Sequence, residues 1–218
     1  CGKKGDTAGL QDILVYVVKG ISVVAEKAGT VDKEVGHYIA KALFATVTNT
    51  SFDDNRFVDI IKQGLALRDE IKGKYNITDD LGDCAVWNAD GKDEFLKKAE
   101  TVGVAATENE DVRSLRELLI YGLKGISAYA DHAAVLGFED ESVFAYLIEG
   151  MASTTKDLSV DDMIAKVLKA GEMAVNVMAI LDKANTETYG NPEISEVNIG
   201  VGKNPGILIS GHDLKDME

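Results

Sequence analysis

The chain has 218 residues, of which 45% are hydrophobic, so it can bury a sizeable core as one large domain or two small subdomains. Its 23 basic and 37 acidic side chains give a formal net charge of −14, which repels nucleic-acid phosphates and anionic membrane surfaces and excludes both as partners. The longest purely apolar runs, such as residues 13–18, are too short to span a bilayer, and two cysteines make no disulfide framework, so we expect a soluble, cytoplasmic protein.

Helical spacing of apolar residues dominates the first 190 residues, which contain no proline. Asp53 and Ser159 are predicted N-caps, with Ser159 and Asp162 resembling a capping box, and Gly29 and Gly137 suit C-terminal stops. The pattern predicts an all-α fold with helices at about 7–28, 33–48, 54–74, 93–101, 112–136, 140–153 and 160–186.

An internal repeat relates the two halves of the chain. Residues 10–28 match residues 115–133 at an offset of 105, which pairs Gly20 with Gly125 in two Lys-Gly-Ile-Ser motifs. Further on, the pairs Ala45–Ala152, Thr48–Thr155, Asp54–Asp161, Lys62–Lys169 and Gly64–Gly171 have an offset of 107. The repeat predicts two tandem three-helix bundles, each with a close helix crossing at its Lys-Gly-Ile-Ser glycine. We expect the first bundle at 1–75, a linker with a short helix at 76–111, and the second bundle at 112–189.

The character of the chain changes after residue 189. A glycine-rich loop at 198–206 leads into a short apolar, β-prone segment at 206–210, just before His212. Residues 190–218 therefore predict a loop and a short strand that begins a truncated α/β domain. The loop does not fit a dinucleotide-binding motif, because it precedes the strand and lacks the third glycine. The first residue is not Met, and residues 214–218 resemble the start of a helix, so we expect the polypeptide to continue at both ends.

Three histidines and two cysteines are the candidates for metal chemistry. His37 and His132 fall within predicted helices, which favours structural roles. His212 follows a strand, so it is either a ligand or proton donor in a cleft, or a loop histidine that caps the next helix. Cys1 is either an iron–sulfur ligand, favoured as a thiolate by Lys3 and Lys4, or the first residue of a lipoprotein, although the usual polar spacer is missing.

Two further features have structural explanations. Cys84 precedes an apolar stretch and is interpreted as a packed or partly exposed free thiol. The acidic run at 108–111 could bind a divalent cation, but an acidic start to a helix explains it more simply.

Several long segments resemble one known family. They are residues 1–12, Leu43-Phe44-Ala45-Thr46, and residues 105–119, 152–162 and 188–215. Along essentially its whole length the chain resembles the hybrid cluster protein family, also called prismane protein or hydroxylamine reductase. That family shares a structural group with nickel–iron carbon monoxide dehydrogenases, and its first domain is a pair of three-helix bundles.

The resemblance implies two metal centres in the complete enzyme. One is an N-terminal iron–sulfur cluster, 4Fe-4S or 2Fe-2S by class, held by four cysteines of which Cys1 corresponds to the last. The other is a hybrid iron–sulfur–oxygen cluster, with His212 as one of its ligands. The remaining ligands would lie outside this chain. We therefore expect the chain alone to be metal-free and inactive, and no catalytic residue is assigned within it.

For the complete enzyme the resemblance implies reduction of hydroxylamine to ammonia and water, or of nitric oxide under nitrosative stress, with electrons from a donor protein. Two alternatives remain open. A duplicated helical bundle with an acidic surface also suits a non-catalytic module that binds a protein partner. A carbon monoxide dehydrogenase relative would share the architecture.

Overall fold

The computed structural model describes residues 2–48 and 51–207, and this part of the chain is all-α and contains no strand. Its helices are α1 (Gly5–Ala28), α2 (Lys33–Val47), α3 (Asp54–Lys74), α4 (Lys92–Val102), α5 (Glu110–Val135), α6 (Glu141–Ser153) and α7 (Val160–Tyr189), with short 3₁₀ turns η1 (Asp83–Ala85) and η2 (Val104–Ala106). All seven predicted helices are confirmed. The predicted strand at 206–210 lies largely outside the described residues, and its first two residues have no regular structure.

The predicted helix ends are also confirmed. The Asp53 side chain accepts a hydrogen bond from the backbone N–H of Asn55 at the start of α3. At the start of α7, the hydroxyl of Ser159 accepts from the N–H of Asp162 at 3.1 Å and donates to its carboxylate at 2.7 Å. Gly29 and Gly137 have φ of 63° and 84° where α1 and α5 end, a conformation that glycine adopts without strain.

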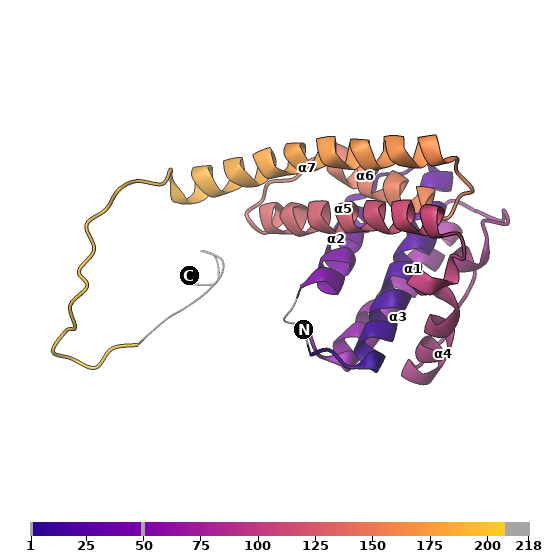
Figure 1. Ribbon diagram of the computed structural model, residues 1–218, viewed down its shortest axis with the longest axis horizontal. Helices are drawn as coiled ribbons and strands as arrows, with labels where there is room; N and C mark the ends of the chain where they lie inside the picture. The colour runs from indigo at the N-terminus through magenta and orange to yellow at the C-terminus, as the bar shows by residue number, and fades with distance from the viewer. Residues whose placement is uncertain (1, 49–50, 208–218) are drawn as a thin grey trace.

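The helices form two groups that run across each other (Figure 1). In the first group α1 packs against α2, α3 and α4, and in the second α5 packs against α6 and α7. The groups join through contacts of α2 with α5, of α1 with α6, and of α2 with α6. Exchanging the two halves turns the contact of α2 with α5 into that of α6 with α1, and it leaves the contact of α2 with α6 unchanged, as an internal repeat requires. Most of the buried apolar residues of both groups form one continuous core, and a small second cluster contains Val23, Cys84 and Ala152. The predicted division into separate bundles stays a prediction.

The register of the repeat differs from the predicted offset of 107 after the first helix. In α2 and α6 the equivalent positions are 108 apart: the N-caps Asp32 and Asp140 each accept a hydrogen bond from the backbone N–H two residues later, at 3.0 and 2.8 Å. In α3 and α7 they are 106 apart, which aligns the caps Asp53 and Ser159. The loop before α6 is one residue longer than the loop before α2, and α6 itself is two residues shorter than α2, so no single offset can hold.

The prediction that Gly20 and Gly125 both lie at close helix crossings is wrong. A Cβ on Gly20 would lie 2.1 Å from the carbonyl oxygen of Cys84 and 3.5 Å from a side-chain carbon of Arg68 in α3, so the close contact of this glycine is with η1. Gly125 is exposed, and a Cβ there would meet no atom within 4 Å. Close helix contacts lie instead at other glycines. A Cβ on Gly36 of α2 would lie 2.4 Å from the ring of Phe144 of α6, and one on Gly64 of α3 would lie 2.1 Å from the hydroxyl of Tyr38 of α2.

Helix α1 is buried on nearly all sides. It is the one described helix that is long and apolar enough to cross a membrane by length and composition, but most of it is covered by the other helices of the protein. A central core helix needs the same composition, because every face of it meets apolar neighbours.

Candidate functional site

The predicted ligand Cys1 lies outside the described residues, but the residues that follow it are held in place. The ammonium group of Lys3 donates to the carbonyl of Thr48 at 2.9 Å. Close by, the hydroxyl of Thr7 donates to the carboxylate of Asp54 at 2.6 Å, which ties the first turn of α1 to the start of α3. The neighbourhood is an open polar cavity of about 350 Å³ lined by Gly2, Lys4, Thr7, Phe52, Asp53, Asp54, Asn55 and Lys92.

An ion-pair network closes one side of this cavity. The ammonium group of Lys92, at the start of α4, lies 3.0 Å from the carboxylate of Asp6 and 2.8 Å from that of Asp54. Hydrogen bonds from Lys92 and Thr7 lower the pKa of Asp54, so its carboxylate stays charged and keeps the three helices together near neutral pH. The cavity therefore places Lys4 and the segment leading from Cys1 against the joined ends of α1, α3 and α4.

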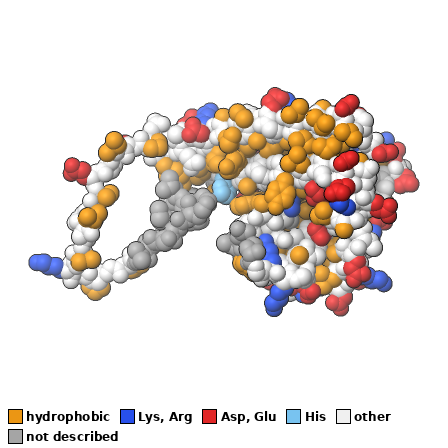
Figure 2. All heavy atoms as spheres, in the orientation of Figure 1, with side chains coloured by type: hydrophobic (Ala, Val, Ile, Leu, Met, Phe, Trp, Pro, Cys, Tyr) orange, Lys and Arg blue, Asp and Glu red, His pale blue; other side chains and the backbone are white. Residues whose placement is uncertain are grey.

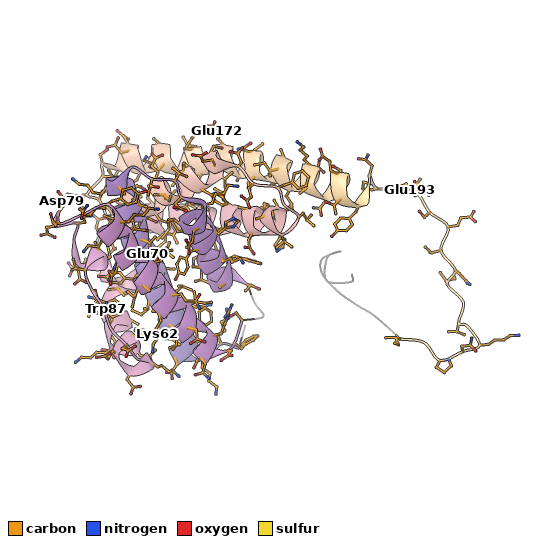
Figure 3. The ribbon with its side chains drawn as sticks, turned by 180° about the vertical axis from the view of Figure 1, so that it is seen from behind. Lys62, Glu70, Asp79, Trp87, Glu172 and Glu193 are labelled. Carbon is orange, nitrogen blue, oxygen red and sulfur yellow. The ribbon has the colours of Figure 1, made fainter. Side chains whose placement is uncertain are left out.

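The second predicted ligand, His212, also lies outside the described residues. The segment that leads toward it, residues 190–207, is exposed throughout and lies away from the helices. In Figure 3, Trp87 lies among the helices of the first half, whereas Glu193 lies on the segment that leaves α7. The glycine-rich loop contains a local turn, in which the N–H of Gly200 donates to the Asn198 side chain at 2.9 Å. Both predicted ligands, Cys1 and His212, thus lie outside the described residues.

The other two histidines have structural partners. His37 Nε2 lies 3.0 Å from a carboxylate oxygen of Glu139, and its ring packs on Phe144 with 5.2 Å between centroids. The ring of His132 meets Phe44 edge to face, also at 5.2 Å. Both contacts join α2 to the second half of the chain, as the predicted structural roles require.

A second cavity, of about 360 Å³, lies where the two halves and the linker meet. It is lined by Tyr16, Lys19, Leu81, Gly82, Asp83, Cys84, Thr101, Val102, Gly103, Ala106, Thr107, Arg116, Glu117, Thr154 and Thr155. At the edge of this cavity, the carboxylate of Asp83 accepts hydrogen bonds from Tyr16 and from Lys98, the latter at 2.5 Å. These bonds lower the pKa of Asp83, whereas burial raises the pKa of Tyr16, so the carboxylate is charged and the phenol neutral.

A charge cluster beside this cavity follows the internal repeat. Asp12 and Lys19 of α1 correspond to Glu117 and Lys124 of α5 at the offset of 105. Lys124 is the main opposite charge near Asp12, and Glu117 is the main opposite charge near Lys19, so each acid faces the lysine of the other half. Burial raises the pKa of Asp12 and lowers those of both lysines, which makes the charged forms less favourable than in water.

Sequence reasoning missed this cluster. The repeat did pair Lys19 with Lys124, and charged residues recurring at one place in two apolar helices are a signal that they serve an interior role. What the sequence did not show is that α1 and α5 place these groups near one another.

Cys84 is the packed thiol that the sequence predicted. It is buried in η1, and burial raises the pKa of its thiol, so the reactive thiolate is disfavoured. The acidic run at 108–111 begins α5, with Asn109 as the N-cap, which confirms the structural explanation for it.

Among residues 2–48 and 51–207, no group of three or more His, Cys, Asp or Glu side chains is placed to hold a metal ion. The described residues therefore do not by themselves provide the thiolate and imidazole donors that iron clusters need.

Comparison with known proteins gives consistent matches over the full length. The Prismane/CO dehydrogenase family matches residues 1–218. The chain is 59% identical to a hydroxylamine reductase of Desulfosudis oleivorans, 54% identical to one of Nitratidesulfovibrio vulgaris and 50% identical to one of Acetivibrio thermocellus. Each match covers 100% of this chain but 41% of the relative, so the chain spans about two fifths of the length of these proteins.

Proposed function

Because the chain belongs to the Prismane/CO dehydrogenase family, we propose that it is the N-terminal helical part of an iron–sulfur oxidoreductase that reduces hydroxylamine, nitric oxide or both. The observation that carries the proposal is the identity of 50–59% to proteins named hydroxylamine reductase over every residue of the chain. Reduction of hydroxylamine to ammonia and water consumes two electrons and two protons, so the complete enzyme needs an electron-donor protein. We place it in the cytoplasm, with no nucleic-acid or membrane partner.

We assign two ligands in this chain. Cys1 would be the last cysteine of the N-terminal iron–sulfur motif, and the adjacent Lys3 and Lys4 favour its thiolate. His212 would bind an iron of the hybrid cluster through a neutral imidazole nitrogen. When bound, the clusters supply the electrons and an open iron. The chain itself is proposed to be inactive alone, because the remaining ligands lie elsewhere.

The described helices would serve as the frame for these ligands. The bonds of Lys3, Thr7 and Lys92 described above fix the start of α1 and the residues that follow Cys1 in the sequence. A frame of this kind holds a ligand at the geometry a cluster requires without itself touching substrate.

The test is a ligand substitution in the complete, anaerobically purified protein. His212→Ala should keep the helical circular dichroism and the N-terminal cluster, but lose the spectrum of the hybrid cluster and hydroxylamine turnover. Changes to groups that merely support a ligand cost roughly 10–100-fold, so loss of the ligand should cost at least that. His132→Ala is the matched control and should keep the cluster spectrum.

Normal hybrid-cluster spectra and turnover in His212→Ala would refute the ligand assignment. A complete protein that purifies colourless and without iron would instead favour a non-catalytic helical module that binds a partner. Oxidation of carbon monoxide in place of hydroxylamine reduction would favour a carbon monoxide dehydrogenase relative.

A further inference from the structure

In the first half of the chain, a segment of irregular structure crosses the outer side of α1 and α3. Its backbone carbonyl at Cys84 lies against Gly20 of α1, and Trp87 packs edge-on against Tyr16, with 5.9 Å between ring centroids. Three residues of α3 bind the same segment. The ammonium group of Lys62 lies 3.0 Å from the carboxylate of Asp90, and the Asp69 carboxylate accepts a hydrogen bond from the Asn88 side chain at 3.3 Å. The ammonium group of Lys72 donates to the carbonyl of Ala85 at 3.2 Å. Residues 83–90, which we call the covering segment, thus close this side of the helices.

The internal repeat identifies the matching positions in the second half. At the offset of 105, a side of α1 with Ile13, Tyr16, Gly20 and Val24, of which Tyr16 and Gly20 contact the covering segment, corresponds to a side of α5. Its members there are Leu118, Tyr121, Gly125 and Tyr129. At the offset of 106, the residues of α3 that bind the covering segment correspond to residues of α7. Lys62, Asp69 and Lys72 become Leu168, Val175 and Met178.

These matching positions are exposed. Ile13 is 0% exposed whereas Leu118 is 56% exposed, and Tyr121 and Leu168 reach 68% and 71%. Helices α5 and α7 lie side by side, in contact at Gly122 and Ala170. Figure 2 shows hydrophobic side chains gathered along both helices on the face turned to the viewer. Large apolar groups at this density on adjoining helices mark a surface that is normally covered.

The occupant of this surface is indicated by chain order. The covering segment belongs to the stretch that directly follows α3, and the equivalent stretch in the second half is the one that directly follows α7. Its described part, residues 190–207, carries exposed apolar side chains at Ile194, Val197, Ile199 and Val201, whose character matches the apolar residues of α7. The relatives also extend well beyond the length of this chain, because the matches cover 41% of them.

We propose that in the complete protein the polypeptide following α7 lies across α5 and α7 as the covering segment lies across α1 and α3, with backbone against Gly125 and apolar side chains on Leu168, Val175 and Met178. The two halves of the duplicated structure would then pack a following segment in the same way. The residues of α3 that bind the covering segment are polar or charged, whereas the corresponding residues of α7 are apolar. The proposal is independent of which reaction the enzyme catalyses.

The test uses the complete polypeptide with the photo-crosslinking residue p-benzoylphenylalanine in place of Tyr121. Irradiation should give a crosslink within one chain, mapped by mass spectrometry to a residue after 189. The same substitution at Tyr75, exposed at the end of α3, should give no crosslink to that region. A crosslink between two chains would overturn the proposal in favour of a dimer interface, and the absence of any protein crosslink from position 121 would show that the surface is open.

A pair of glycine variants of the complete polypeptide gives an independent readout. Gly125→Leu should lower the melting temperature by several degrees, as Gly20→Leu should, because each side chain would displace a backbone. Gly73→Leu, at an exposed helical glycine with open space around it, is the control and should not lower the melting temperature. Unchanged melting in Gly125→Leu alongside a large loss in Gly20→Leu would overturn the proposal.

Discussion

Arg68 is the largest side chain that the described core buries completely. Its guanidinium donates to the carbonyls of Cys84 and Trp87 at 3.2 and 2.6 Å, and it meets the carboxylate of Asp69 through two nitrogens at 2.9 and 2.7 Å. A buried cation is tolerated when its donors are satisfied in this way. Arg68 thereby holds the covering segment against α3 from inside the core.

Replacing Arg68 with Met should destabilise the protein by about 2–5 kcal/mol, because each buried carbonyl left without a donor costs about 1–3 kcal/mol. Urea unfolding measures the difference in unfolding free energy. Arg56→Met, at an exposed position of the same helix, is the matched control and should change stability by less than about 0.5 kcal/mol. Equal stability of the two variants would show that the segment is held without Arg68.

Ionisation of the buried phenol of Tyr146 should lower the stability of the protein at alkaline pH. It is nearly completely buried and donates to the carbonyl of Lys166 at 2.9 Å. Burial, with help from Glu149 and Glu172, raises its pKa from 10.0 to about 12. A raised pKa means that the folded state retains a proton that the unfolded state loses. The stabilisation is therefore fully present below about pH 10 and is lost as the pH rises toward 12.

The size of this effect follows from the pKa shift, since one pKa unit corresponds to about 1.4 kcal/mol and two units to about 3 kcal/mol. Unfolding free energies of wild type and Tyr146→Phe, measured by urea at several pH values from 8 upward, should converge as the pH rises above about 10. Tyr75→Phe, at an exposed ring, should keep the wild-type dependence. Parallel curves for wild type and Tyr146→Phe would contradict the burial argument.

At the scale of elements, α1 and α5 show how one sequence motif serves two environments. Both helices direct one side toward the shared core, where Leu14 and Ile21 of α1 correspond to Leu119 and Ile126 of α5, all buried. Only α1 has its opposite side covered among the described residues, by η1 and α4. The Lys-Gly-Ile-Ser glycine is therefore a contact point in α1 and an exposed residue in α5.

The crossing of α2 and α6 at Gly36 should be intolerant of any side chain. A Cβ there would lie 2.4 Å from the ring and 2.8 Å from the Cβ of Phe144, which is itself buried. Gly36→Ala should therefore destabilise by about 1–3 kcal/mol, although alanine is the better helix former. Thermal unfolding followed by circular dichroism measures the change.

Gly73→Ala should have the opposite effect on stability. A Cβ there meets no atom within 4 Å, so only the higher helix propensity of alanine changes the unfolding free energy. It should stabilise by up to about 1 kcal/mol. A stabilising Gly36→Ala would mean that the α2–α6 crossing is wider than described.

At the scale of the whole molecule, the core is made from side chains of α1 to α7 and needs no group from outside. Most buried apolar residues of both halves belong to one cluster, which contacts between the halves make continuous. Such a core stabilises helices by burial of apolar area alone.

The chain of residues 1–218 should accordingly fold without iron. Its far-ultraviolet circular dichroism should be predominantly helical after expression in iron-depleted medium, and its melting temperature should not change on addition of a chelator. A fall in helicity or melting temperature with chelator would mean that a metal ion holds the helices together.

The sequence alone determined the seven helices, the caps at Asp53 and Ser159 and the stops at Gly29 and Gly137. These features depend on residues within a turn or two of one another, and such local interactions can be read from spacing. The resemblance to the hybrid cluster protein family also came from the sequence, because long matching segments need no knowledge of their positions in space. The proposed roles of Cys1 and His212 depend on that resemblance.

Only the tertiary structure decided what each repeated residue contacts. The sequence paired Gly20 with Gly125 and Lys19 with Lys124, but it could not show that one glycine meets η1 while the other is exposed. Nor could it show that the two lysines face acids across α1 and α5, or that differences in loop and helix length shift the register to 108 and then 106. The physical reason is that these outcomes depend on contacts between residues far apart in the chain, which are set by how whole helices pack and not by the residues' own neighbours.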